Sequence, residues 1–241
     1  MRCLFSPLIS TAARVHQSDS HYNVRMSEPH IISCATVAEE LRQLGVKEKN
    51  LTVLEFGLHV YPEELKKRLQ ETIDGVPGDC DILLGYGLCS YSVAGLKSES
   101  HRLIIPLIDD CIALFLGSRA ERKRMMAEEP GTYFLTTGWV EAQEDTLAEY
   151  ARISERYGEE RALKVARAMF GNYTRVALIN TGNYKMDIYR DFARAMAEFL
   201  ELRFEELPGS NRMLLKMLAG DWEGEFLVVP AGEPIPADAF T

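Results

Sequence analysis

Short apolar runs alternate along the chain with segments in which apolar residues recur every three or four positions. The apolar runs cover residues 30–34, 51–56, 80–86, 103–108, 132–135, 175–179, 203–206 and 226–229. Helices are expected over 36–44, from Pro62 onward, over 111–116, in two segments within 141–170, around 189–200 and over 210–219. This alternation predicts an α/β fold whose parallel sheets are flanked by helices.

The strand-helix order appears in both halves of the chain and predicts two Rossmann-like βαβ lobes. We expect residues 30–135 to form an α/β lobe that carries the functional site, and 136–241 to form a helical connector and a second α/β lobe. One sheet with a long helical insertion is the alternative. Residues 1–29 lack periodicity, so we expect a disordered extension or an incorrectly assigned start, with Met26 as the true first residue.

Composition excludes several classes of protein. A content of 46% hydrophobic and 26% charged residues supports a packed core. The 36 acidic and 27 basic residues leave a net charge of -9, which argues against a general nucleic-acid binder. No run approaches the roughly 18 apolar residues that span a bilayer, so we expect no membrane association. Five cysteines in a chain of this length favour free thiols or metal ligands in the reducing cytoplasm.

Four residues of metal-ligand type follow four successive predicted strands. Cys34 ends the first strand, and His59, Cys89 and Cys111 come after the second, third and fourth. Carboxyl ends of parallel strands share one sheet edge, so these side chains are expected to converge. A Cys3His set predicts a zinc site, with an iron-sulfur cluster as the alternative. If the cysteines are instead small buried hydrophobes, no such site exists. Cys80 begins its strand and should be structural.

Three further residues are candidates for the site. Asp110, beside Cys111, is the candidate catalytic group, because a carboxylate can orient a histidine or hold a water molecule. Gly87 and Tyr184 are assigned to cofactor binding. Gly87 would let the backbone approach a ligand, although Ser90 replaces the third glycine of a dinucleotide loop. Tyr184 ends a loop that would face the cysteines if the lobes closed.

Several short motifs are spread along the chain: Gly57-Leu-His59 with Pro62-Glu63, the segment LLGYGLC at 83–89 with Gly95-Leu96, Ile105-Pro106, Asp110-Cys111, Leu116-Gly117-Ser118, Gly131 to Thr136, Gly138-Trp139, and Gly220-Asp-Trp222 with residues 226–230. Together these motifs resemble those of domain-of-unknown-function family sixteen thirty-eight. The resemblance covers about residues 30–235. Position 109 differs from the expected family pattern, because this chain has Asp109 where a histidine is expected before Asp110-Cys111.

The resemblance implies an association with corrinoid-dependent methyl transfer. The expected partners are a corrinoid protein, which would supply the corrinoid, or a methyltransferase, and the expected ligand is a small-molecule thiol or methyl donor. The residues and the resemblance together leave three functions: a zinc-dependent methyltransferase-like enzyme acting on a thiol or a corrinoid methyl group, a metal-free cysteine enzyme, and a non-catalytic module that binds a cofactor or partner of a methyltransferase system. In the second, Cys89 or Cys111 is the nucleophile, His59 the base and Asp110 the orienting acid.

Overall fold

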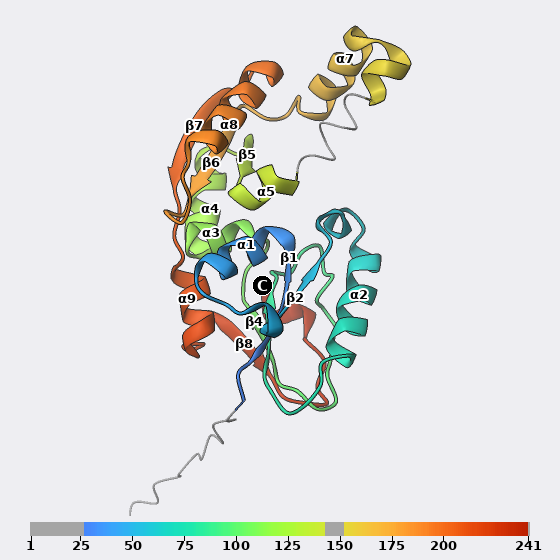
Figure 1. Cartoon of the computed structure of the whole chain (residues 1–241), viewed down its shortest axis with the longest axis vertical. Coiled ribbons are helices and arrows are strands. Elements are labelled where there is room, and N and C mark those ends of the chain that lie inside the picture. The colour runs from blue at the N-terminus through green and yellow to red at the C-terminus, as the bar shows by residue number, and fades with distance from the viewer. Residues whose placement is uncertain (1–26, 143–151, 241) are drawn as a thin grey trace, which may run out of the picture.

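Two sheets carry the fold, and helices pack against both of them (Figure 1). The computed structural model describes residues 27–142 and 152–240, so the predicted extension up to Met26, with Cys3, lies outside the described residues. The five-stranded sheet has the order β2-β1-β3-β4-β8, and the three-stranded sheet has the order β5-β6-β7. All pairs are parallel except β4 with β8. The predicted α/β fold with parallel sheets is confirmed.

The element bounds agree closely with the hydrophobic pattern. The strands are β1 (His30–Cys34), β2 (Leu51–Leu54), β3 (Ile82–Gly85), β4 (Leu103–Pro106), β5 (Thr132–Leu135), β6 (Arg175–Asn180), β7 (Arg203–Pro208) and β8 (Phe226–Val229). The helices are α1 (Ala35–Gln43), α2 (Pro62–Asp74), α3 (Ile112–Leu116), α4 (Arg119–Glu128), α5 (Thr137–Ala142), α7 (Glu159–Met169), α8 (Asp187–Leu200) and α9 (Arg212–Ala219). Residues 152–157 are also helical. Short 3-10 helices are η1 (Glu48–Asn50), η2 (Phe56–Val60) and η3 (Ala237–Phe240).

Local chemistry explains where these elements begin and which face they bury. Strand β3 is buried at every position, as expected for a strand that is covered on both faces. Pro62 starts α2, where its missing N–H costs no hydrogen bond. Leu65, Leu69 and Ile73 then recur every fourth residue and form the buried face of α2. The hydroxyl of Ser118 accepts the N–H of Glu121 at 3.0 Å and caps α4.

The strand order creates a topological switch point at β1. The chain runs from β1 to β2 on one side and then returns to pair β3 with β1 on the other side. At such a point the connections after the two strands diverge and leave a crevice at their carboxyl ends, which is where open α/β sheets bind ligands. Cys34 is the last residue of β1, so it lies at this switch point.

The observed strand pairing crosses the predicted boundary between the two lobes near residue 135. Strand β5, placed in the first predicted lobe, pairs with β6 of the three-stranded sheet. Strand β8, placed in the second predicted lobe, returns to the five-stranded sheet and pairs antiparallel with β4. Apolar alternation marks a strand but not its partner, so neither pairing could be recognised from the local pattern.

A shared core joins the two sheets. One cluster of buried residues combines Ile31 and Ile104 of the five-stranded sheet with Ala177 and Ile179 of β6. Helices α1, α3 and α9 contribute to the same cluster and therefore lie between the sheets. The outer face of the five-stranded sheet packs against α2, and the outer face of the three-stranded sheet packs against α8. The sheets are therefore layers of one packed body.

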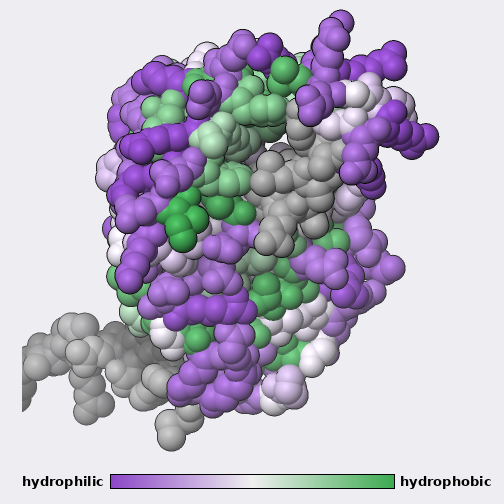
Figure 2. All heavy atoms as spheres, turned by 45° about the horizontal axis from the view of Figure 1, so that its top comes forward, coloured by the Kyte–Doolittle hydropathy of each residue, from purple (hydrophilic) through white to green (hydrophobic). Residues whose placement is uncertain are grey.

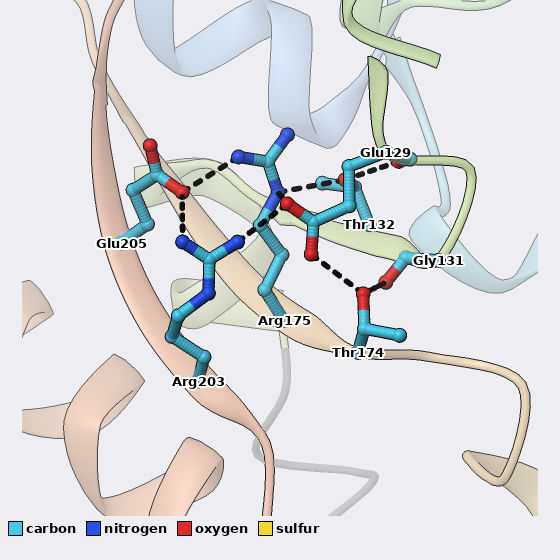
Figure 3. A network of polar contacts seen from close by, with 7 residues as sticks. All are labelled: Glu129, Gly131, Thr132, Thr174, Arg175, Arg203 and Glu205. Carbon is cyan, nitrogen blue, oxygen red and sulfur yellow. Dashed lines mark hydrogen bonds and ion pairs between the residues drawn. The ribbon is translucent and has the colours of Figure 1, made fainter. Parts of the chain in front are cut away.

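Ion pairs hold the amino ends of the three-stranded sheet together (Figure 3). Arg175, only 7% exposed, donates to the Thr132 hydroxyl at 2.8 Å and to Glu205 at 2.6 Å. Arg203 and Thr174 both donate to Glu129, so all three strands and the turn before β5 share one network. This edge lies opposite the carboxyl ends, and we interpret the network as structural.

The surface carries mostly polar side chains. Hydrophilic residues cover much of the face shown in Figure 2, and the hydrophobic residues that reach it form separate patches. Among residues 27–142 and 152–240, no helix has the length and apolar character needed to cross a bilayer.

Candidate functional site

Three cysteines meet at the carboxyl edge of the five-stranded sheet. Cys34 ends β1, Cys89 lies in the turn after β3, and Cys111 lies between β4 and α3. The charge of Cys34 raises the pKa of both other thiols, which shows that the three sulfur atoms share one environment. All three are free, and all three are partly exposed. The predicted convergence of these cysteines is therefore found in the structure.

Cys34 and Cys111 form a hydrogen-bonded pair with opposite preferences for the proton. The hydrogen bond from Cys111, followed by those from the Thr36 hydroxyl and the backbone N–H groups of Val37 and Thr36, lowers the pKa of Cys34 to about 7. The same hydrogen bond, together with burial and the nearby charges, raises the pKa of Cys111 well above its usual value. Cys34 therefore holds the thiolate and Cys111 the proton.

The first turn of α1 adds to the stabilisation of the Cys34 thiolate. Cys34 is the residue that precedes α1, and its Sγ lies 3.0 Å from the Thr36 hydroxyl. Unpaired N–H groups at a helix N-terminus carry partial positive charge, and a thiolate there is favoured for the same reason that any anion is. Reactive cysteines in proteins are commonly placed in this way.

Cys89 occupies a strained backbone segment and holds its proton. Cys89, Ser90 and Tyr91 have φ values of 43°, 56° and 66°, so three consecutive residues with side chains are left-handed. Each such residue costs roughly 1 kcal/mol or more. Burial and the charge of Cys34 raise the pKa of Cys89 to about 12. Cys89 is therefore a poor nucleophile compared with Cys34.

Gly87 allows the loops that carry Cys89 and Cys111 to touch. A Cβ atom at Gly87 would lie 2.8 Å from the carbonyl oxygen of Ile108 and 3.0 Å from the Asp110 nitrogen. The N–H of Leu88 donates to the same Ile108 oxygen at 2.8 Å, and that of Cys89 donates to the Asp109 oxygen at 3.0 Å. The neighbouring loop thus lies directly beside Gly87, and cofactor binding by this residue stays a prediction.

Two residues of the site were not recognised from the sequence. Tyr86 is 3% exposed, and its hydroxyl has no hydrogen-bond partner in the described part of the chain. Burial raises the pKa of Tyr86 most, and the charges of the three thiols raise it further. Thr36, expected only as the first residue of a helix, places its hydroxyl 3.0 Å from the Cys34 sulfur. A hydroxyl residue next to the carboxyl end of a buried strand is the signal that could have revealed both.

His59 belongs to an aromatic group instead of a ligand set. It lies in the 3-10 helix η2, is exposed, and its Nδ1 bonds the carbonyl oxygen of Phe56. Its ring packs at 4.8 Å from the ring of Phe56 and at 5.5 Å from that of Trp139. The turn after β2 therefore directs this side chain onto neighbouring rings.

Asp110 is held by an arginine. Its carboxylate accepts from Arg122 at 2.9 Å and from the N–H of Ile112 at 3.1 Å. Its charge also raises the pKa values of Cys89 and Cys111, so it lies beside the thiols. Other basic residues of α4 form similar pairs, since Arg119 binds Asp109 and Arg124 binds Glu121. Asp110 therefore favours the protonated form of the neighbouring thiols.

The predicted function as a metal protein is wrong. Within the described residues, no group of three or more His, Cys, Asp and Glu side chains is arranged to hold a metal ion. The physical reason lies in the contacts above: His59 is bound to Phe56, and Cys34 is bound to Cys111 and Thr36. The predicted metal-dependent methyltransferase reaction required this metal centre, so that prediction is also wrong.

Two residues remain from the sequence analysis: Cys80, which was expected to be structural, and Tyr184, which was assigned to cofactor binding. Cys80 precedes β3 and is buried, and its carbonyl oxygen bonds the ring of His101 at 2.9 Å. This position at the amino end of the strand agrees with the predicted structural role. Tyr184 follows β6 and lines a cavity between the sheets together with Thr137 and Gly138.

Comparison with known proteins gives one match. The model of a family described as a protein of unknown function (DUF1638) matches residues 53–218, which is more than half of the chain. Neither the curated proteins nor the solved structures contain a match to this chain.

Proposed function

Because the chain belongs to the DUF1638 family, whose description assigns no chemistry, we propose a function from the arrangement of its thiols: Cys34 and Cys111 form a dithiol that exchanges with a disulfide substrate. The observation that supports this proposal is the position of the two side chains at the switch point of the sheet, where they are close enough for the Cys111 thiol to lower the pKa of Cys34. Both residues are partly exposed at the carboxyl edge of the sheet.

The first step uses the thiolate of Cys34. Its sulfur attacks one sulfur of the substrate, the substrate S–S bond breaks, and the leaving sulfur departs with the electron pair and takes a proton from solvent. A mixed disulfide between Cys34 and the substrate results. A pKa of about 7 for Cys34 suits this role, because thiols whose pKa is near the ambient pH attack fastest.

The second step uses Cys111. The interaction with the Cys34 side chain raises the pKa of Cys111 most, followed by burial and by the charge of Cys34. Once Cys34 is in the mixed disulfide, that charge is gone and Cys111 loses its proton more readily. The Cys111 sulfur then attacks the Cys34 sulfur and releases the second half of the substrate as a thiolate. The substrate gains two electrons, the protein holds a Cys34–Cys111 disulfide, and an external dithiol restores it.

Mapping of the sulfur bonds tests the proposal. Reduced protein is incubated without oxygen with bis(2-hydroxyethyl) disulfide, acid-quenched and analysed by peptide mass spectrometry. We expect a Cys34–Cys111 bond in the wild type, a stable mixed disulfide on Cys34 in Cys111→Ser, and no exchange in Cys34→Ser. Cys80→Ser, at the other end of β3, should react like the wild type, and circular dichroism checks that each variant is folded.

Other bonding patterns would overturn the proposal. Attack by Cys89 predicts a mixed disulfide on Cys89, and a non-specific reaction predicts exchange that persists in Cys34→Ser. The partner inferred from the family resemblance, a corrinoid protein or a methyltransferase, stays a prediction, and the exchange reaction does not require it.

A further inference from the structure

The ring of His101 is held between two backbone carbonyl groups at the amino edge of the five-stranded sheet. Its Nδ1 lies 2.9 Å from the carbonyl oxygen of Cys80, and its Nε2 lies 3.0 Å from that of Val76. Val76 follows α2 and Cys80 precedes β3, so the ring contacts both ends of the connection between these elements. His101 itself precedes β4 and is only 2% exposed.

These two contacts define the protonation state in which the ring fits its site. A carbonyl oxygen only accepts hydrogen bonds, so each ring nitrogen must carry a hydrogen to bond the carbonyl that it faces. Neutral imidazole has one N–H group, whereas imidazolium has two. In a neutral ring, one nitrogen would turn its lone pair toward a carbonyl oxygen, and one buried hydrogen bond would be lost. Both bonds therefore form only when His101 is charged.

The end of α2 offsets part of the cost of burying this charge. Helix α2 ends at Asp74, and Val76 follows it by two residues. Carbonyl groups at the C-terminus of a helix carry partial negative charge and stabilise a histidine cation there. Nearby, Arg102 donates to Asp81 at 2.8 and 2.6 Å, and this pair joins the residue before β4 to the residue before β3. The charged ring thus lies beside negative ends of the backbone.

A second histidine, His30, faces this contact from β1. Its Nε2 lies 2.8 Å from the Thr52 hydroxyl of β2. Burial lowers the pKa of His30 most, and the charge of His101 lowers it further. The protonation state of His30 therefore reports on the charge of His101. The other titratable groups beside the contact adjoin it in the chain, and they are Asp74, Asp79, Cys80, Asp81 and Arg102.

We propose that His101 is a pH switch: its imidazolium fastens the connection between α2 and β3 to the start of β4, and loss of one ring proton loosens that connection. Because the closed arrangement holds a proton that the open one releases, its stability falls as pH rises. The switch lies at the amino edge of the sheet, opposite the dithiol, so it goes beyond the exchange reaction and does not depend on it.

Two measurements on the full chain test the switch, both from about pH 5 to about pH 9. NMR correlation of the ring nitrogens shows whether both carry hydrogen, and contacts with protons of Val76 and Cys80 identify the His101 signals. Amide hydrogen exchange, corrected for the intrinsic effect of pH, follows His30 and Ile82, whose N–H groups donate to the carbonyl oxygens of Asp81 and Arg102. We expect two ring N–H groups at low pH. As one is lost, amide protection should fall about tenfold, as loss of one hydrogen bond would produce.

Two variants assign the fall in protection to His101. His101→Gln keeps a side-chain donor but does not titrate, so protection should no longer depend on pH. In the same variant the midpoint for the titration of His30 should move upward, because one cause of its lowered pKa is removed. His59→Gln replaces an exposed histidine at the opposite edge of the sheet and should behave like the wild type. The amides of β6, in the other sheet, are the internal control and should show no fall.

Three results would overturn the switch. They are a neutral His101 ring at every pH at which the protein is folded, protection of His30 and Ile82 that does not change with pH in the wild type, and a fall in protection that His101→Gln retains. The first two are measured on the wild type alone, so they decide the question even if His101→Gln does not fold. Each of these results leaves the proposed dithiol reaction unaffected.

Discussion

At the scale of single residues, the site depends on which sulfur carries the proton. Cys34 has Thr36, Val37 and Cys111 as hydrogen-bond donors, whereas Cys89 and Cys111 face a negative neighbour. Similar thiols at one sheet edge thus become chemically different through their contacts. Only the thiolate is nucleophilic, so this difference should appear in the pH dependence of each cysteine.

The alkylation rate of Cys34 by iodoacetamide should rise with pH and level off, with a midpoint near pH 7. A lowered pKa populates the thiolate at lower pH, so the midpoint should lie below the ordinary value of 9.0. Cys111→Ala removes the hydrogen bond that lowers the pKa most and should move the midpoint upward. Peptide mass spectrometry of quenched samples gives the rate for each cysteine.

Cys89→Ala is the control for this pH profile. Cys89 is not among the groups that shift the pKa of Cys34, so the midpoint should stay near pH 7. A wild-type midpoint near 9.0, or one that Cys111→Ala leaves unchanged, would show that the two thiols are not coupled.

The residues of this site could be predicted from the sequence only in part. The positions of Cys34, Cys89 and Cys111 followed from strand ends, because a parallel sheet brings its carboxyl ends to one edge. His59 also follows a strand, but η2 forms there and places its ring on Phe56. That turn depends on contacts with Trp139, which is distant in sequence, so local patterns could not reveal it.

At the scale of elements, close approach between two loops positions Cys89 and Cys111. Strand bounds were largely predictable: residues 30–34, 132–135 and 226–229 match the structure at both ends. The paths of the loops after β3 and β4 were harder to predict, because they depend on backbone hydrogen bonds between the two loops. Gly87 lies at this contact.

Gly87→Ala should destabilise the protein by about 1–3 kcal/mol, the usual cost of overpacking. The new methyl group would meet the backbone of Ile108 and Asp110, which cannot rotate away as a side chain could. Urea unfolding measures the loss, and alkylation of the folded variant should show a changed Cys34 profile because Cys111 moves.

Gly57→Ala is the matched control, since nothing lies within 4 Å of a Cβ atom at that position. Its unfolding free energy should stay within about 0.5 kcal/mol of the wild type. Equal stability of the two alanine variants would contradict the role assigned to Gly87.

At the scale of the whole molecule, a buried carboxyl group links α1 to the second half of the chain. Glu40 is 1% exposed and accepts hydrogen bonds from the Thr181 hydroxyl, at 2.8 Å, and from the Asn183 side-chain amide. Burial raises its pKa above the ordinary 4.5 despite these bonds. Because α1 also carries Cys34 at its N-terminus, this contact fixes the helix on which the thiolate depends.

Glu40→Gln should become more stable relative to the wild type as pH rises from below 4.5 to neutral. The raised pKa means that folded Glu40 keeps its proton after the unfolded chain has lost it, so wild-type stability falls through that range. Glutamine carries no such proton and lacks this fall. Urea unfolding of both proteins at several pH values measures the difference.

Glu198→Gln, on the exposed side of α8, is the control and should show no comparable trend. A stability difference between Glu40→Gln and the wild type that stays constant with pH would rule out a buried, proton-holding carboxyl group.

The return of β8 to the five-stranded sheet has a consequence for synthesis. Strand β8, the partner of β4, follows more than a hundred residues later in the chain. During synthesis, one edge of β4 is therefore unpaired until β8 has been translated. Unpaired strand edges can pair with other chains, and strands that are far apart in the sequence pair slowly. The β4 side of the five-stranded sheet would then be completed only after β8 is synthesised, and chains truncated before β8 would expose β4 to aggregation.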